Sequence, residues 1–381
     1  MFLQSILEIA SIIIIVYAMA LIQSHFFAFF SGRNLEYECH FSTDEAFEGE
    51  QIYIIETVTN RKKLPVLWLK AELDTSKWLD FAESESVVTH NTRFVTSNFI
   101  LKGGQRITRK WPVYCTKRGS YSIENVALVW SDILGMKSNS LHINVNANLI
   151  VYPSIMDLQK IGLSRKTLMG DITANRWINE DPFITSGVRS YSEFDPLNRI
   201  HWLSTAKTGK LMSRKNEFTS DKKLFIILNM QSTPDDIEEV LDKEIAEFNI
   251  KIAASLIDEA FSKSIPVQLA VNGVIDRNDN LRGIVSNDGM DRQHSKSLLY
   301  YLAQLELKVS ERFLTFLESL NIQNDSHALL ITPYINDSLL ASAMSLSSKG
   351  INTSVIIGGY CDSKDLNAGI DIYCIDPSQK I

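Results

Sequence analysis

The chain has 381 residues, of which 45% are hydrophobic and 22% charged, and its formal net charge at pH 7 is -7. This length is enough for two or three domains that bury their own cores without the help of disulfides or metals. The acidic balance argues against a sequence-independent nucleic-acid binder, which normally carries a basic face. The four cysteines, Cys39, Cys115, Cys361 and Cys374, form no Cys-x-x-Cys pair. We therefore expect buried thiols in a reducing compartment rather than disulfides or a zinc site.

The N-terminal segment is apolar and almost without charge. After Glu8, no Lys, Arg, Asp or Glu occurs until Arg33. At about 1.5 Å per residue, a helix of this length crosses a hydrocarbon core of about 30 Å. A cleaved signal peptide would need a basic start and a small-residue cleavage site, whereas this segment begins "MFLQSILE" and ends "HFFAFF". A buried core helix is the other alternative. The segment predicts a retained single-span anchor in the cell membrane, over residues 1–32.

The orientation of this span depends on the basic residues that follow it. Arg33 and the cluster at residues 61–63 come after the span, and nothing basic precedes it except the amino terminus. The positive-inside tendency therefore favours the cytoplasm for the bulk of the chain. Acidic residues are as abundant there, so the orientation stays open at this point.

Residues 33–150 are expected to form a β-sandwich. About seven short runs, among them "QIYIIETVTN", "RFVTSNFIL" and "LHINVNANLIVYP", are rich in β-branched and aromatic residues and are separated by turn-forming clusters. This spacing is typical of an antiparallel sandwich of immunoglobulin-like kind. No residue in this region indicates a chemical role.

Residues 222–381 have the alternating pattern of a doubly wound α/β domain. The buried strand "KKLFIILNM" is followed by a helix expected to start at "STPDD", by the strand "PVQLAVNG", and by a long amphipathic helix ending near Leu320. The strands "HALLITPY" and "NTSVIIGGY" follow, with a helix between them. Such an order indicates a parallel sheet, and ligands of these sheets bind beyond the carboxyl ends of the strands. We therefore expect any site of this domain at residues 229–233.

The residues at that position depart from a known cation-binding pattern. An α/β domain of von Willebrand factor A type has Asp-x-Ser-x-Ser after its first strand, because a divalent cation prefers hard oxygen ligands that include a carboxylate. Here Asn229, Gln231 and Thr233 stand at the three ligand positions, and Asp235 and Asp236 are expected in the first turn of the next helix. The sequence predicts neither a functional metal site nor a cofactor.

A connector over residues 151–221 joins the two predicted domains. Its most unusual part, residues 187–218, carries a set of candidate binding residues: Gly187, Arg189, Tyr191, Asp195, Arg199, Trp202, Lys207 and Arg214. Three interpretations remain open. Arg189 or Arg199 could pair with Asp195 or Glu217 and lock the domains together. The basic residues could form a docking surface for an acidic partner or a phosphate. His201 could act as a general base, although no nucleophile is recognisable by spacing. We expect Trp202 to be packed.

The connector resembles the signature of the family catalogued as domain of unknown function 58, a membrane-associated bacterial family. The pattern runs from Gly187-x-Arg189-x-Tyr191 through Asp195-Pro196 and "RIHW" (residues 199–202) to Lys207 and the basic tail that contains Arg214. The sandwich stretches "NRKKLPVLWLKAEL" and "KRGSYSIENVALVWSDILGM" are similar as well, so the resemblance covers nearly the whole chain. The chain departs from the pattern by Lys207 in place of an Arg, by the altered cation motif, and by one span where relatives often have two.

The resemblance implies a protein that works with a MoxR-type AAA ATPase and binds proteins through an A-type domain. Together with the residue patterns, it predicts a membrane-anchored, non-enzymatic adaptor or scaffold in the assembly or remodelling of an envelope complex. It predicts no nucleic-acid partner. The alternative is a hydrolase-type enzyme with its site in residues 187–218.

Overall fold

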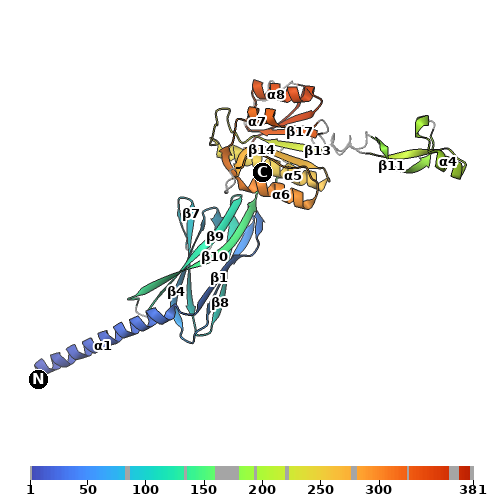
Figure 1. The fold of residues 1–381 in the computed structure, drawn as a ribbon. Helices are drawn as coiled ribbons and strands as arrows, with labels where there is room; N and C mark the ends of the chain where they lie inside the picture. Colours follow the sequence, from blue (N-terminus) through green and yellow to red (C-terminus); the bar gives the residue numbers. More distant parts are fainter. Residues whose placement is uncertain are drawn as a thin grey trace. The chain divides into compact units, whose positions relative to one another are not determined.

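The chain forms two compact units in the computed structural model, Met1–Ser154 and Ile155–Ile381 (Figure 1). The structure describes residues 2–81, 86–132, 135–158, 180–192, 195–218, 223–275, 281–323, 326–359 and 369–377.

The first unit begins with helix α1 (Phe2–Ser31), which is long and apolar. Within it, Glu8–Ser31 has a mean hydropathy of 2.1 in its most apolar window and is almost entirely exposed. By length and composition this segment can cross a membrane, although a signal sequence at an N-terminus would meet the same criteria. The helix ends against the following domain, because a Cβ atom at Gly32 would lie 2.0 Å from the ring of Trp130. Glycine is therefore required where the chain passes this ring.

The rest of the unit consists of two sheets that share one core. One sheet has the order β1 (Leu35–Phe41), β3 (Gln51–Asn60), β8 (Arg106–Cys115), β5 (Leu79–Asp80). The other has the order β2 (Glu45–Phe47), β10 (Ser138–Tyr152), β9 (Gly119–Ser131), β4 (Val66–Ser76), β7 (Thr92–Leu101), β6 (Ser86–Thr89). All neighbours are antiparallel except β2 and β10. In its described residues, the sandwich has ten strands, three more than the seven or so that the sequence predicted. The additional strands β2, β5 and β6 are short edge strands, which are too brief to show an alternating pattern.

The core of the sandwich contains a carboxylate as well as apolar side chains. Glu56 is fully buried and accepts hydrogen bonds of 2.6 Å from the Tyr37 hydroxyl, the Ser97 hydroxyl and the Trp111 indole N–H. Since Ser97 lies in the other sheet, this carboxylate ties the two sheets together. Buried charges of this kind are tolerated when their hydrogen bonds are satisfied.

Two of the cysteines belong to this core. Cys39 and Cys115 are buried free thiols, as expected from the sequence. Burial raises the pKa of Cys39 to about 12 and that of Cys115 to about 11, so both stay protonated and unreactive. Cys374, in the second unit, is disulfide-bonded, so the expectation of thiols throughout the chain is wrong at this position.

The second unit contains a sheet of mostly parallel strands. Its order is β15 (Leu281–Val285), β14 (Val267–Ile275), β13 (Lys223–Leu228), β17 (Ser326–Thr332), β18 (Asn352–Gly358), β19 (Asp371–Ile375), and β16 (Leu305–Val309) also pairs with β14. β15 and β16 are antiparallel to β14, and the other pairs are parallel. The chain adds β14 on one side of β13 and β17 on the other, so a topological switch point lies between β13 and β17.

Helices cover both faces of this sheet. α7 (Phe313–Ser319) and α8 (Asp337–Ser348) share a core with Phe225 and Ile227 of β13. α5 (Lys243–Ser262) and α6 (Arg292–Gln304) lie on the opposite side, where Leu224, Ile226 and Leu228 are buried (Figure 1). The continuous apolar run of β13 reflects this burial on both faces.

Two sequence predictions about the helices are wrong. α5 begins at Lys243 with Asp242 as its N-cap, and the preceding residues from Ser232 form a loop because their side chains bond to each other. The long helix expected to end near Leu320 is divided into α6, β16 and α7. Leu, Lys and Glu of β16 favour a helix over a strand, so its pairing with β14 overrides their local preference.

Candidate functional site

A small module in the second unit carries the candidate binding residues. β11 (Glu180–Ser190) and β12 (Met212–Phe218) pair antiparallel, and a turn with the 3-10 helix η1 (Leu197–Arg199) and the helix α4 (Trp202–Thr208) connects them. We call this element, residues 180–192 and 195–218, the β11–α4–β12 module. A two-stranded element of this size is only marginally stable alone, so the hydrogen bonds and ion pairs within the module are important for its conformation.

The turn of the module is held by Asp195, which is buried. Its carboxylate accepts a hydrogen bond from Arg189 and one of 3.0 Å from the Ser192 backbone N–H, and the Tyr191 hydroxyl donates to its carbonyl at 3.0 Å. The Ser192 N–H bond lowers the pKa of Asp195, burial raises it, and Arg189 lowers it further, with a net lowering. Asp195 therefore stays ionised and fixes the turn.

This ion pair corrects one interpretation of the sequence. The expected Arg189–Asp195 pair is present, but both partners belong to the module. The pair shapes the turn between β11 and α4 and does not lock two domains together. Glu217, the other expected acceptor, has its side chain outside the described residues.

The short helix α4 is capped at both ends by residues of the signature. The His201 Nδ1 atom accepts a hydrogen bond of 3.1 Å from the Ser204 backbone N–H, and Gly209 ends the helix in the left-handed conformation with φ 68°. Since Nδ1 is the acceptor, a neutral His201 carries its proton on Nε2. A general base needs a free lone pair, so His201 can serve as one only if it leaves its capping position.

The outward face of the module is apolar and basic. The exposed large apolar side chains are Val188, Leu197, Trp202, Leu203 and Leu211, whose exposed fractions are 41%, 72%, 68%, 66% and 48%. The expectation that Trp202 is packed is therefore wrong, because α4 has only seven residues and buries none of them. Lys207 and Arg214 are exposed as well. Of residues 187–192 and 195–214, only Asp195, Ile200 and Ser213 are buried.

Two other signature residues have smaller roles in this geometry. Arg199 ends the 3-10 helix and is half-buried. Gly187 pairs with Lys215, and a Cβ atom there would meet no atom within 4 Å. Nothing in the structure explains glycine at position 187.

The carboxyl end of β13 places the altered cation motif at the switch point. Asn229 is fully buried, its Oδ1 accepts from the Gln231 backbone N–H at 3.0 Å, and its Nδ2 donates to the Thr332 hydroxyl at 3.1 Å. Asn272 of β14 lies beside it and accepts from the Met230 backbone N–H at 2.7 Å. The amide at position 229 thus bridges β13 and β17.

Gln231 and Thr233, the other two motif positions, are also engaged. The Gln231 amide donates to the Asp236 carbonyl and accepts from the Phe313 backbone N–H, both at 2.7 Å. The Thr233 hydroxyl donates to Asp236 Oδ1 at 2.7 Å. The oxygens that would bind a cation are therefore used inside the protein.

Asp236 is the centre of this network. It is buried, and its Oδ2 accepts from the backbone N–H and the hydroxyl of Ser232 at 2.7 and 2.8 Å and from the Leu241 N–H at 3.3 Å. Burial raises the pKa of Asp236, but the hydrogen bonds from Thr233 and Ser232 outweigh it and the net pKa is lowered. In the described part of the chain, no group of three or more His, Cys, Asp or Glu side chains could hold a metal ion.

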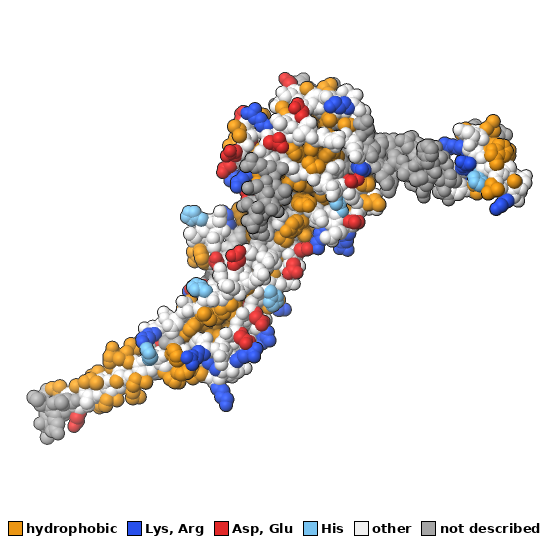
Figure 2. All heavy atoms as spheres, viewed as in Figure 1, with side chains coloured by type: hydrophobic (Ala, Val, Ile, Leu, Met, Phe, Trp, Pro, Cys, Tyr) orange, Lys and Arg blue, Asp and Glu red, His pale blue; other side chains and the backbone are white. Residues whose placement is uncertain are grey.

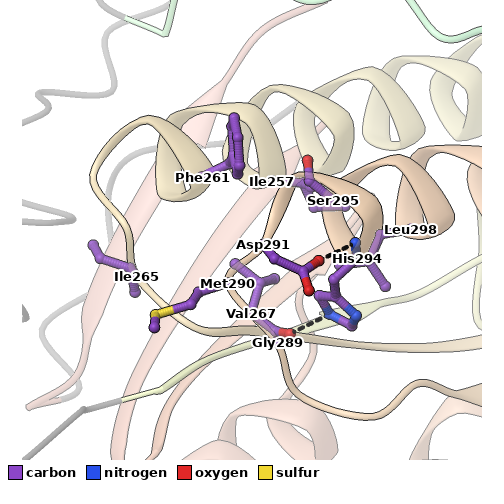
Figure 3. Close-up of a pocket in the computed structure, with 10 residues that line it drawn as sticks. All are labelled: Ile257, Phe261, Ile265, Val267, Gly289, Met290, Asp291, His294, Ser295 and Leu298. Atoms are coloured by element: carbon purple, nitrogen blue, oxygen red, sulfur yellow. Dashed lines mark hydrogen bonds between the residues drawn. The ribbon is translucent and has the colours of Figure 1, made fainter.

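A small enclosed space near α6 has no room for a ligand (Figure 3). Asp291 accepts from the His294 backbone N–H at 2.6 Å, and the His294 ring lies 2.9 Å from the Val267 carbonyl. The space beside them is about 10 Å³, which holds at most one water molecule. These side chains cap α6 and bind it to β14.

Comparisons with known proteins give little further information. No family model matches the chain. The chain is 22% identical over 197 residues to the uncharacterized protein YeaD of Bacillus subtilis (strain 168), a match that covers 52% of this chain and 45% of that protein. The chain therefore spans less than half of this relative's length.

Solved structures resemble the chain only weakly. A non-cellulosomal cohesin from Archaeoglobus fulgidus is 17% identical and has a TM-score of 0.21, covering 30% of this chain and 91% of its own. The CARDB domain of the PF1109 protein from Pyrococcus furiosus is 14% identical and has a TM-score of 0.22, covering 31% and 86%. Similarities this low carry no argument about function.

The sequence did not predict that leucines of the module are exposed, or that Asp236 accepts the hydrogen bond of Thr233. A short segment rich in Leu and Trp, too small to bury them, is a signal for the first. No signal in the sequence identifies Asp236, because a carboxylate after a Pro is equally typical of a helix start.

Proposed function

We propose that the protein is a membrane-anchored, non-enzymatic adaptor or scaffold whose β11–α4–β12 module docks a protein partner. The observation that carries this proposal is the surface of α4, on which Trp202, Leu203 and Lys207 are all exposed. Exposed clusters of aromatic, aliphatic and basic side chains are typical of interaction surfaces, and Trp is among the residues that contribute most binding energy.

The nature of the partner rests on the resemblance to the domain of unknown function 58 family. That resemblance implies a MoxR-type AAA ATPase and work on an envelope complex. The basic charge of the module supports a partner with an acidic surface, since complementary charge speeds and orients association. A role in nucleic-acid binding is not part of the proposal.

The proposal includes a finer assignment of the two folds. In the sheet of the second unit, β13, the first strand in the chain, lies in the centre. β14 and β15 follow on one side of it, and β17, β18 and β19 follow on the other. This order supports a von Willebrand factor A-like domain, and the two antiparallel sheets of the first unit support an immunoglobulin-like sandwich. The saturated network around Asn229, Gln231 and Thr233 supports protein binding that uses no divalent cation.

The anchor and its orientation are also proposals. α1 is long and apolar enough for a single span, and Arg33 and Lys62 beyond it favour the cytoplasm for the bulk of the chain. The disulfide of Cys374 opposes this orientation, because disulfides are rare in the cytoplasm. Alkylation of thiols during denaturing lysis of the cells, with and without a reductant, tests it. Cytoplasmic placement predicts that Cys374 is modified without a reductant once the cells are lysed under denaturing conditions, and a disulfide that persists there would place this unit outside.

The alternative of a hydrolase-type enzyme at residues 187–218 has less support. His201 is the residue best suited to acid–base chemistry there, and its Nδ1 lone pair is used to cap α4. A turnover lost in His201→Ala with the fold intact would favour the enzyme.

Affinity purification of cross-linked native membranes tests the adaptor directly. The wild type is compared with Trp202→Ala/Leu203→Ala/Lys207→Glu, and with Phe94→Ala/Val87→Ala/Lys110→Glu, which removes exposed side chains of similar kinds from the sandwich. We expect an AAA ATPase with the wild type and the sandwich variant, and its loss with the module variant. Equal recovery from all three proteins would contradict the proposal, as would the absence of any ATPase.

A further inference from the structure

A second site candidate lies where α1 meets the sandwich. The Arg33 guanidinium stacks on the Phe29 ring at 4.2 Å from its centroid and lies 5.3 Å from that of Phe30. The Lys137 ammonium, from the hairpin between β9 and β10, donates to His25 Nδ1 at 2.8 Å. Lys62, from the loop between β3 and β4, donates to the carbonyl of Arg33 at 2.9 Å. Three separate segments thus bring cations to one end of the helix.

These cations border an open apolar groove on the helix. Figure 2 shows the hydrophobic surface of α1 giving way to Lys and Arg where the sandwich begins. The groove is lined, among others, by Ile22, His25, Phe26, Phe29, Phe30 and Lys137. Since Arg33 stacks on two of these rings, both Arg33 and Lys137 lie at its edge.

The cations of the groove have no carboxylate partner within the described residues. Arg33 contacts only aromatic rings there, Lys137 contacts His25, and Lys62 contacts backbone carbonyls. Asp132, the nearest acidic residue on the hairpin, is buried and accepts from the backbone N–H of Lys137. Among the described residues, this cluster of positive charge beside an apolar surface therefore has no counter-ion.

The length of the span places this groove at the headgroup layer. Glu8–Ser31 has 24 residues, or about 36 Å of helix, against a hydrocarbon core of about 30 Å. The last turn of α1 and its aromatic side chains therefore lie near the membrane–water interface, where Phe, Lys and Arg meet both acyl chains and phosphates. A phospholipid has the matching chemistry, with an apolar tail for Phe26 and a phosphate for the cations.

We propose that this groove binds an anionic phospholipid, with its phosphate between Arg33 and Lys137 and an acyl chain along the Ile22 and Phe26 side of the helix. The proposal rests on the proposed membrane anchor. Zwitterionic lipids carry the same phosphate but a compensating cation, so the site favours a net negative headgroup. Lys62 caps the C-terminal carbonyls of α1 and adds positive charge behind the site.

The test uses the full chain in nanodiscs of phosphatidylcholine mixed with phosphatidylglycerol. After partial delipidation, native mass spectrometry counts the two lipids that stay bound. We expect phosphatidylglycerol to be enriched on the wild type, and each cation removed to lower the enrichment by roughly fivefold. Arg33→Gln/Lys137→Gln should lose the preference, whereas Arg33→Lys/Lys137→Arg, which keeps both charges, should retain most of it.

A matched variant distinguishes binding at this groove from attraction of anionic lipid by positive charge elsewhere on the protein. Lys77→Gln/Lys117→Gln removes two positive charges from the other end of the sandwich, where both lysines lie over the Trp78 ring. This variant should keep the preference. Loss of preference in both Gln pairs, or in neither, overturns the proposal. A chain that enters nanodiscs without any lipid preference overturns it while the anchor stands, and a chain that enters no nanodisc overturns both.

Discussion

The β11–α4–β12 module and the carboxyl end of β13 differ in how many of their side chains are buried and hydrogen-bonded inside the protein. At the end of β13, the side chains of Asn229, Gln231, Thr233 and Asp236 form hydrogen bonds with one another and with neighbouring groups. Few of their polar atoms are therefore available to a ligand. In the module, the internal hydrogen bonds hold the turn around Asp195 and the ends of α4, while Trp202, Leu203 and Lys207 are exposed. The first region thus offers few free polar groups, whereas the second is the surface that we propose to contact another molecule. The place where the fold class predicts a site is therefore the less suitable of the two.

The largest expected effect is on the saturated network. Asp236→Ala leaves the Ser232 and Thr233 donors without their acceptor, so we expect the free energy of unfolding to fall by about 2–4 kcal/mol. The exposed neighbour provides the control, since Asp235→Ala should change stability by less than about 0.5 kcal/mol. Urea unfolding at neutral pH measures both. Equal effects of the two substitutions would contradict the role given to Asp236.

The stabilisation by Asp236 should depend on pH. The pKa of Asp236 is lowered in the folded protein, so its stabilisation is complete above the unfolded pKa and is lost as the pH falls through the folded value. The stability gap between the wild type and Asp236→Ala should therefore shrink below about pH 4. A gap that widens in acid would show that the pKa is raised.

An intermediate effect is expected for the module surface. Trp202→Ala/Leu203→Ala/Lys207→Glu should weaken partner binding by at least about tenfold and change stability by less than about 0.5 kcal/mol, because these side chains are exposed. Binding to the purified partner and thermal unfolding measure the two quantities separately. A large loss of stability would mean that these side chains are packed in the folded protein, which would contradict an exposed binding surface.

Divalent cations should have almost no effect on the wild type. With every ligand position at the end of β13 hydrogen-bonded, its Tm should be the same in Mg²⁺ and in a chelator. The comparison variant is Asn229→Asp/Gln231→Ser, which restores a carboxylate and a hydroxyl at the cation-binding positions and should gain about 3 °C in Mg²⁺. A wild type that gains as much as the variant would show that the network opens for a cation.

The smallest effect is expected at the ion pair inside the module. Arg189→Gln removes one of the groups that lower the pKa of Asp195, while the Ser192 N–H bond remains. The pKa of Asp195 should therefore rise only part of the way toward its ordinary value. An NMR titration of the carboxyl group measures it, and an unchanged pKa would mean that the two side chains do not interact in solution.

The sequence predicted most of the elements because their patterns are local. The apolar run of α1, the alternation in β3 and the buried run of β13 each determine an element without reference to its neighbours. The errors occur where a specific contact, or the lack of one, decides the conformation and no periodic pattern shows it. β16 is a strand because it pairs with β14, and Ser232 and Thr233 stay in a loop because Asp236 accepts their hydrogen bonds. Trp202 is exposed because the module around α4 is too small to cover it.

The signature residues of the module were named from the sequence, but their arrangement and the exposed leucines were not. The signature residues Arg189, Tyr191 and Asp195 do meet in one turn, as their spacing allows. Nothing in the spacing shows that His201 caps a helix, or that Leu197 and Leu211 are exposed. Those facts depend on the folded conformation of the segment between β11 and β12.

Photo-cross-linking from position 202 tests the central claim most directly. A photoreactive phenylalanine analogue replaces Trp202 in the full chain, and a second protein carries it at Phe94, which is exposed on the sandwich. After irradiation of native membranes, mass spectrometry identifies what is attached at each position. The account predicts that position 202 captures an AAA ATPase through an acidic surface and that position 94 does not. Cross-links from position 202 only to the chain itself, or the same partners from both positions, would contradict it.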